Sequence, residues 1–249
     1  MSLTKSLFIT IALVSLAGCA VPQWQPPTGR QKVAVAAIVN PMADQLHLGI
    51  TVFGNSFEHV DMGFDINKEI NQVLRDQLAK SGRYDLVDMP VDSKDFARGS
   101  TWKQGWSVNS LPKPMADQLV QAAKGRGIDY IIAVIDVRAS MGGADGWGLF
   151  QHRGGCYDAY LSYFVFVVNA HTGVTEASTS HDGFRRVQGI DWDEAWSAIP
   201  DDKRAEILAD LKSIVREDIP WTLTVLGIVP GNSAPSDRGV TVCNPTNGG

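Results

Sequence analysis

The pattern of apolar and polar positions predicts a series of strands along the chain. Residues 32–39, KVAVAAIV, form a continuous run of small and β-branched side chains that ends before Asn40 and Pro41, which is typical of a buried strand. Further strands are expected at residues 83–89, 128–140, 156–170 and 174–187. The last two flank a turn at residues 171–173 and are expected to pair as an antiparallel hairpin. Residues 46–64 alternate only in part, so a hairpin and a long loop are both open there.

Apolar side chains recur at three- and four-residue spacing in three other segments, which predicts amphipathic helices. These segments are residues 65–82, 114–127 and 203–218. Asp65 is expected to cap the start of the first helix and Gly82 its end. Pro220 directly follows the third helix, so residues 219–229 are open to two interpretations, a strand or more helix packed on the core.

The order of these elements predicts the fold class. Strands and helices interleave early and a hairpin follows, so we expect a single α/β (α+β) domain, residues 32–229, with a mixed sheet and helices packed against it. Residues 90–113 are expected to be irregular, and so is the segment 141–155, which contains six glycines. Residues 230–249 are expected to form a loose C-terminal tail.

The first 18 residues have the form of a secretory signal. A positive charge at Lys5 precedes an apolar run of about a dozen residues, whereas a bilayer-spanning helix needs about 20. The residues Leu16-Ala17-Gly18-Cys19 resemble the bacterial lipobox. That resemblance implies that residues 1–18 are removed and that Cys19 carries the lipid. Ala20 stands where an aspartate would retain such a protein in the inner membrane, which resembles the outer-membrane sorting pattern.

The segment after the cysteine predicts how the domain is held. Residues 20–31 are rich in proline and glutamine, so residues 19–31 are expected to be a lipidated cysteine and a flexible tether. The mature protein is then expected to lie in the periplasm, anchored to the outer membrane through its lipid. The formal net charge is −5 and no basic run stands out, so a nucleic-acid partner is not expected.

Two cysteines remain besides Cys19. In an oxidising compartment Cys156 and Cys243 can form a disulfide, and two unpaired thiols are the alternative. Neither has a second metal ligand at close spacing, so the sequence predicts no zinc site and no cofactor.

Catalytic signatures are missing from the sequence. It contains no G-x-S-x-G nucleophile elbow, no phosphate-binding loop and no H-E-x-x-H zinc helix. An alternative function, an envelope hydrolase or ligand-binding lipoprotein, would use His152, Asp158 and His181. A metal site needs three or four converging ligands, and solvated loop histidines are the simpler interpretation.

Tryptophans in the two expected loops are candidate partner-binding residues. Trp102 and Trp106 lie in one loop, and Trp147 and Phe150 in the glycine-rich one. Aromatic rings on exposed loops anchor protein partners because they bury much area at low entropic cost. The alternative is that the rings fold back and fill the core. Trp192 and Trp196, four residues apart before the third helix, are expected to be core residues.

Three segments resemble landmarks of a known family: QLAKSGRYDLVD (77–88), QAAKGRGIDYIIAVIDV (121–137) and FVVNAHTGVTEAS (166–178). They resemble the amino-terminal domain of TolB and the related curli secretion-channel (CsgG-type) lipoproteins. Here Asn169 replaces the acidic residue that usually starts the last turn. The resemblance implies a TolB-N-terminal-like mixed sheet, but members of such a fold differ in function.

These observations favour a non-enzymatic lipoprotein that binds an envelope protein or associates with itself. The expected recognition surface is formed by the loops 99–111 and 141–155. A subunit of an oligomeric secretion pore is a further alternative, but it needs long alternating strands, and residues 46–64 and 156–187 alternate only in part.

Overall fold

The computed structural model describes residues 23–47, 56–96, 110–136, 146–152, 156–187, 190, 195–231 and 234. Several predictions from the sequence concern positions outside these ranges: the signal segment, Cys19, Trp102, Trp106, Trp192 and Cys243. The side chains of His152 and Cys156 are outside the description too. The signal, the lipid site and the disulfide therefore stay predictions.

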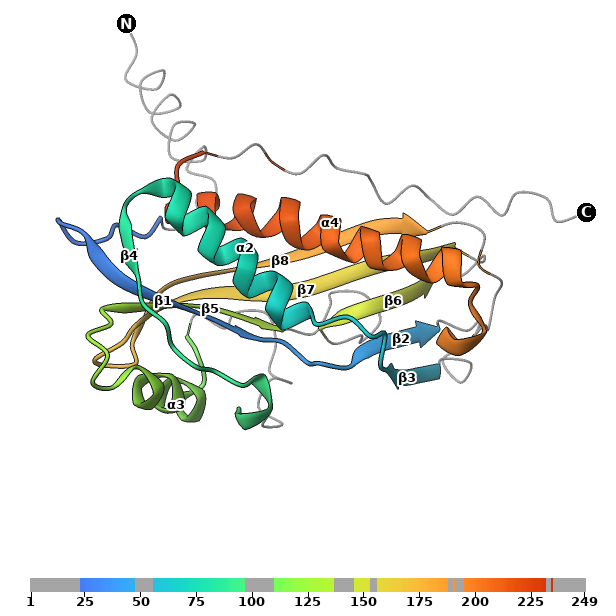
Figure 1. Cartoon of the computed structure of the whole chain (residues 1–249), viewed down its shortest axis with the longest axis horizontal. Coiled ribbons are helices and arrows are strands. Elements are labelled where there is room, and N and C mark those ends of the chain that lie inside the picture. Colours follow the sequence, from blue (N-terminus) through green and yellow to red (C-terminus); the bar gives the residue numbers. More distant parts are fainter. Residues whose placement is uncertain are drawn as a thin grey trace, which may run out of the picture.

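The described chain forms one α/β domain with a mixed sheet, as the sequence predicts (Figure 1). Its eight strands are β1 (Gln31–Ile38), β2 (Ala43–His47), β3 (Ser56–Val60), β4 (Tyr84–Leu86), β5 (Tyr130–Asp136), β6 (Trp147–His152), β7 (Cys156–Asn169) and β8 (Thr175–Val187). Its helices are α2 (Ile66–Ser81), α3 (Lys113–Ala123) and α4 (Asp201–Val225), with short 3-10 turns η2 (Ser93–Asp95) and η4 (Trp196–Ala198). Residues 46–64 contain a hairpin, because β2 pairs antiparallel with β3.

The sheet is built around the long strand β7. One edge of β7 pairs antiparallel with β8, which confirms the predicted hairpin. Its other edge pairs with β6 over the first half and with β5 over the second half, so β5 and β6 lie end to end. In the same way β1 runs parallel to β5 and β2 runs parallel to β6. Two long strands are thus each interrupted in the middle.

Asn40 ties the two interruptions together. Its backbone N–H donates to Asp136 Oδ2 at 3.0 Å, at the end of β5. Its backbone carbonyl accepts from Trp147 Nε1 at 2.6 Å, at the start of β6. The break between β1 and β2 is therefore held against the break between β5 and β6 by polar contacts.

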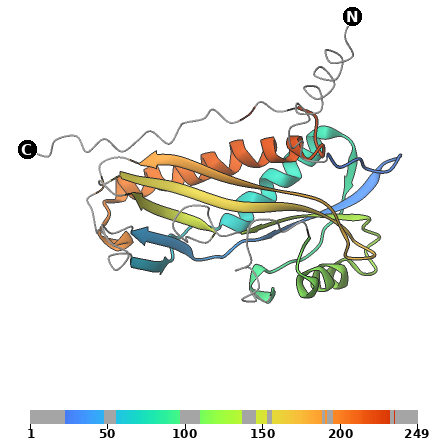
Figure 2. The same cartoon turned by 180° about the vertical axis from the view of Figure 1, so that it is seen from behind.

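Helices cover the two faces of the sheet unequally. The helices α2 and α4 lie side by side on one face, and α3 lies on the other face near one end (Figures 1 and 2). A large core fills the space under α2 and α4, with Ile70 and Leu74 from α2 and Leu211 and Ile214 from α4. A smaller core under α3 includes Leu119.

The helix α2 has the predicted caps. Asp65 accepts a hydrogen bond from the Lys68 backbone N–H at 2.9 Å, which satisfies a free donor of the first turn. Gly82 ends the helix in the left-handed conformation, with φ of 65°.

The ambiguous segment after residue 218 is helical, because α4 continues through Pro220 to Val225. Ile219 and Leu223 keep the helical spacing and are buried, so packing outweighs the cost of the internal proline. The helix approaches β8 closely at Gly183, where a Cβ would collide with Ile214 and Asp218.

The expected flexible tether is shorter than the sequence suggests. Trp24 is only 5% exposed and lies within the larger core. Its backbone N–H donates to the Leu226 carbonyl at 2.7 Å, and its ring stacks on Tyr84 and meets Tyr130 edge-on. The fold therefore fixes the chain from Trp24 onward. We call this region, where β1 starts and α2 and α4 end, the Trp24 end of the domain.

The glycine-rich segment is not irregular throughout, which corrects the prediction for residues 141–155. Residues 147–152 form the inner strand β6. Gly148 is required there because a Cβ would collide with the backbone of Asp44 on the neighbouring strand β2. This glycine permits a close approach of two strands, which local sequence cannot distinguish from a loop signal.

Candidate functional site

A groove opens at the edge of the sheet where the outermost strand position is empty among the described residues. The edge of β1 pairs with β4 only from Gln31 to Val33, and β3 covers only β2. Between β4 and β3 lies a groove of about 650 Å³, which is within the size range of ligand-binding sites. Its walls come from the end of β1, the segment 61–65 before α2, the first two turns of α2 and residues 91–94.

Two asparagines of α2 serve the backbone of this open strand edge. Asn71 Oδ1 accepts from the Ala37 N–H at 3.1 Å. Asn67 bonds the backbone of Val39 twice, with Oδ1 accepting from its N–H and Nδ2 donating to its carbonyl, each at 2.8 Å. The side-chain amides thus take the place that the backbone of a neighbouring strand would have.

The groove carries both signs of charge. Asp61, Asp65 and Asp92 line it together with Lys68 and Lys94. Each of the three carboxylates accepts one local backbone N–H, from residues 63, 68 and 94 respectively. A polar, mixed-charge groove beside a strand edge is suited to binding an extended polypeptide segment, whose backbone can hydrogen-bond to the polar side chains of the groove walls.

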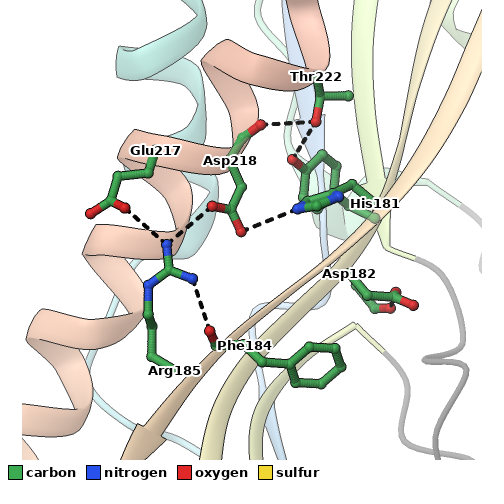
Figure 3. Close-up of polar contacts among 9 residues, drawn as sticks. His181, Asp182, Phe184, Arg185, Glu217, Asp218 and Thr222 are labelled. Atoms are coloured by element: carbon green, nitrogen blue, oxygen red, sulfur yellow. Dashed lines mark hydrogen bonds and ion pairs between the residues drawn. The ribbon is translucent and has the colours of Figure 1, made fainter. Parts of the chain in front are cut away.

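A second polar cluster lies buried between β8 and α4 (Figure 3). Arg185 Nη2 contacts Glu217 Oε2 and Asp218 Oδ1, each at 3.1 Å, and Arg185 Nη1 donates to the Phe184 carbonyl at 2.8 Å. Asp218 is 1% exposed and Arg185 5%. Such a buried pair fixes the position of α4 over β8, because each charge would be uncompensated without the other.

The same cluster extends to β7 through a histidine and a tyrosine. His181 Nε2 lies 3.3 Å from Asp218 Oδ2, and its ring packs 4.9 Å from that of Trp221. The hydroxyls of Tyr163 and Thr222 are 2.8 Å apart. Burial raises the pKa of Tyr163 well above its usual value, so this phenol stays neutral at physiological pH.

A serine–histidine–aspartate set is not assembled here, although Ser162, His181 and Asp182 are close in the sheet. Successive residues of a strand face opposite sides. His181 therefore turns to Asp218 on α4, while Asp182 points away and accepts from Ser162 (Figure 3). The His181–Asp218 and Ser162–Asp182 contacts therefore have a structural role within the sheet and its contact with α4.

The hydrolase set predicted from His152, Asp158 and His181 is also not brought together. Asp158 lies opposite Arg186 and accepts from its Nε at 2.5 Å, whereas His181 lies opposite Tyr163. Five residues of β7 separate these two positions, or about 17 Å. Among the described residues, no three His, Cys, Asp or Glu side chains gather closely enough to hold a metal ion.

The prediction that Trp147 and Phe150 anchor a partner is wrong for the folded domain. Trp147 is 0% and Phe150 1% exposed, because both belong to the inner strand β6. The Trp147 indole N–H donates to the backbone carbonyl of Asn40, and Phe150 packs with Leu46 and Tyr160. Trp196 is partly buried and packs against the main core, close to its expected place.

The sequence pattern does not predict the groove. Its decisive residues are asparagines on the polar side of an amphipathic helix, a position that normally faces solvent. Their role depends on where the pairing of β4 with β1 ends, and the tertiary structure determines that point. The only local signal is a pair of amides one helical turn apart, at 67 and 71.

The three landmark segments meet at the Trp24 end. Gly82 caps α2, and Asp129 Oδ2 accepts from the Lys32 backbone N–H at 2.8 Å before β5 begins. Asn169 Oδ1 accepts from the backbone N–H groups of His171 and Thr172 in the β7–β8 turn. The amide performs the turn-forming role expected of an acidic residue.

No family model matches the sequence, and no curated protein does. Among solved structures, the Xanthomonas campestris protein XCC0632, of the family DUF330, has a TM-score of 0.41 at 13% identity, covering 84% of this chain and 89% of that one. The Chlamydia trachomatis protein CT253 has a TM-score of 0.38 at 9% sequence identity, covering 78% of this chain and 98% of that one. A chain of the PelC dodecamer from Paraburkholderia phytofirmans has a TM-score of 0.34 at 9% sequence identity, covering 82% of this chain and 92% of that one. At these TM-scores the similarities carry no argument about function.

No helix among the described residues has the length and apolar character needed to cross a bilayer.

Proposed function

We propose that this protein is a non-enzymatic lipoprotein of the bacterial outer membrane, facing the periplasm, that acts as an interaction or assembly module. The lipobox at Leu16–Cys19 supports the anchor. The three segments that resemble TolB landmarks also support an envelope role. They are short motifs, and in this chain they form a helix cap, a contact between strands and a turn.

The observation that carries the interaction function is the groove beside β1. An exposed strand edge pairs readily with another chain, so proteins usually cover or block it. Here the edge is partly satisfied by Asn67 and Asn71, and a groove of about 650 Å³ remains along it. The groove is suited to an extended segment of a partner that carries basic residues, because three of its five charged groups are carboxylates.

Site-specific photo-crosslinking in cells tests this proposal. A photoreactive phenylalanine analogue at Lys94, on the groove wall, is expected to give one discrete adduct with an envelope protein or with a second copy of this chain. The same analogue at Ala209, exposed on α4, is the matched control and is expected to give none. If positions 94 and 209 behave alike, the groove is not the partner site.

The anchor is tested separately. Labelled palmitate is expected to appear in the wild-type protein and to be lost from the Cys19→Ala variant. Equal label in both would contradict lipid attachment at this residue.

A further inference from the structure

The docking of Trp24 leaves little chain between the domain and the lipid. If Cys19 carries the lipid, as proposed above, five residue steps separate the anchor from Trp24. A fully extended chain covers about 3.3–3.6 Å per residue, so the span is at most about 18 Å. The Trp24 end of the domain must therefore stay close to the membrane surface.

The docking is firm. The Trp24 indole donates to Glu176 Oε2 at 3.0 Å, in addition to its backbone bond and its contacts with two tyrosine rings. The Tyr84 hydroxyl donates to the Ile228 carbonyl at 2.8 Å and links β4 to the end of α4. The short connection thus orients the domain as well as tethering it.

This end has the opposite charge from the molecule as a whole. Residues 23–32, 80–85, 124–129, 169–176 and 226–231 contain six basic and three acidic side chains, a net charge of +3 with histidine neutral. The whole chain has 22 basic and 27 acidic residues, a net charge of −5. The basic residues at this end are Arg30, Lys32, Lys80, Arg83, Lys124 and Arg126, and all six are exposed.

The three carboxylates at this end are already used within the fold. Asp85 pairs with Arg30 at 2.8 Å, Asp129 accepts from the Lys32 backbone, and Glu176 accepts from Trp24 and Asn169. Within the described part of the chain, no carboxylate pairs with the side chains of Lys80, Arg83 or Lys124. The basic side chains therefore present most of their charge outward.

We propose that the Trp24 end is a membrane-facing surface that binds the anionic headgroups of phospholipids. A polybasic patch is a common second signal beside a lipid anchor, because its charges attract anionic headgroups. Each Lys or Arg near an anionic surface strengthens binding by about fivefold, and the effect decays within a Debye length. Contact of this end with the bilayer would point β3 and the groove wall at residues 61–65 away from the membrane, toward a partner in the periplasm.

The test uses the lipidated protein reconstituted into two kinds of vesicle, phosphatidylcholine alone and phosphatidylcholine with about one third phosphatidylglycerol. Hydrogen exchange is followed by mass spectrometry. In the anionic vesicles, amides in residues 82–84 and 124–129 are expected to exchange severalfold more slowly than in neutral vesicles. Residues 61–65, at the opposite end of α2, are the internal reference and are expected to be unchanged.

Two variants with the same change in charge make the test specific. The triple variant Lys80→Gln, Arg83→Gln and Lys124→Gln is expected to lose the slowing, because three charges are worth about 100-fold in the docking equilibrium. The control replaces three exposed basic residues elsewhere, Lys113→Gln, Lys212→Gln and Arg216→Gln, and is expected to behave as wild type. All six side chains are exposed, so neither variant should unfold.

The outcomes separate this inference from the function on which it rests. Protein that floats with the vesicles in 1 M salt is held by its lipid, since salt at that concentration screens surface charge. If it floats but exchange is the same in both vesicles, or if both triple variants behave alike, the lipid-facing surface is wrong while the anchor stands. If it does not float, both proposals fall.

Discussion

At the scale of single residues, Arg185 and Asp218 form a salt bridge that is buried between β8 and α4. A surface ion pair contributes little to stability, but removing one partner of a buried pair leaves an uncompensated charge in the core. We therefore expect Asp218→Ala to lower the free energy of unfolding by about 3 kcal/mol, with Glu217 remaining to limit the loss. Denaturant unfolding of wild type and variant measures the difference.

The control for that change is the exposed pair of Arg204 and Asp201 at the start of α4. The side chain of Asp201 is 92% exposed, so Asp201→Ala is expected to change the stability by less than about 1 kcal/mol. Equal effects of the two substitutions would show that the Arg185–Asp218 pair does not fix α4.

Tyr163 predicts how stability changes at alkaline pH. Its pKa is raised by burial in the folded state, while the unfolded chain has a value near 10. Below that pH both states are protonated, and above it only the unfolded state loses its proton. Tyr163 should therefore make stability fall by about 1.4 kcal/mol per pH unit above pH 10.

Unfolding of the Tyr163→Phe variant at several values between pH 9 and pH 11 checks this expectation. The variant is expected to lose about 1 kcal/mol at neutral pH, through the missing hydrogen bond to Thr222, and to show a shallower alkaline slope. An unchanged slope would mean that the Tyr163 phenol ionises in the folded protein at its ordinary pH.

At the scale of elements, Gly183 controls how closely α4 lies on β8. A Cβ at this position would collide with Asp218 and Ile214, which belong to the buried face of α4. Gly183→Ala is therefore expected to push the helix outward and cost about 1–3 kcal/mol. Gly231→Ala is the matched control, because its Cβ would meet nothing within 4 Å. Thermal melts of the two variants should differ clearly, and equal melting would contradict a close helix–sheet contact.

The elements also show which features the sequence can predict. Helix α2 is predictable because its apolar stripe and both caps are local, from Asp65 to Gly82. Strand β6 is not, because its glycine at 148 is required by a partner strand about a hundred residues earlier. The continuation of α4 past Pro220 depends in the same way on burial against the sheet. Local sequence patterns predict most helices and strands, whereas long-range packing determines where the structure departs from those patterns.

At the scale of the whole molecule, the candidate site was the least predictable part. The groove exists because β4 stops at Leu86 and β3 covers only β2, and neither strand end has a sequence signal. Trp147 and Phe150, which the sequence predicts to be partner anchors, are core residues. The composition of residues 19–31 predicts that Trp24 lies in a tether, whereas its ring is part of the core. The role of each of these residues is set by distant parts of the chain.

Trp24 therefore gives the last prediction. Trp24→Ala removes a buried indole that packs on Tyr84 and Tyr130, and it is expected to lower the stability by about 3–5 kcal/mol. It should also release the chain before β1, so that trypsin cuts after Arg30 much faster than in wild type. Trp196→Ala, at a partly buried tryptophan at the other end of α4, is expected to leave cleavage at Arg30 unchanged. If Trp24→Ala does not speed cleavage after Arg30, the segment is held by its backbone bonds alone, and the indole does not set the distance between the domain and the membrane.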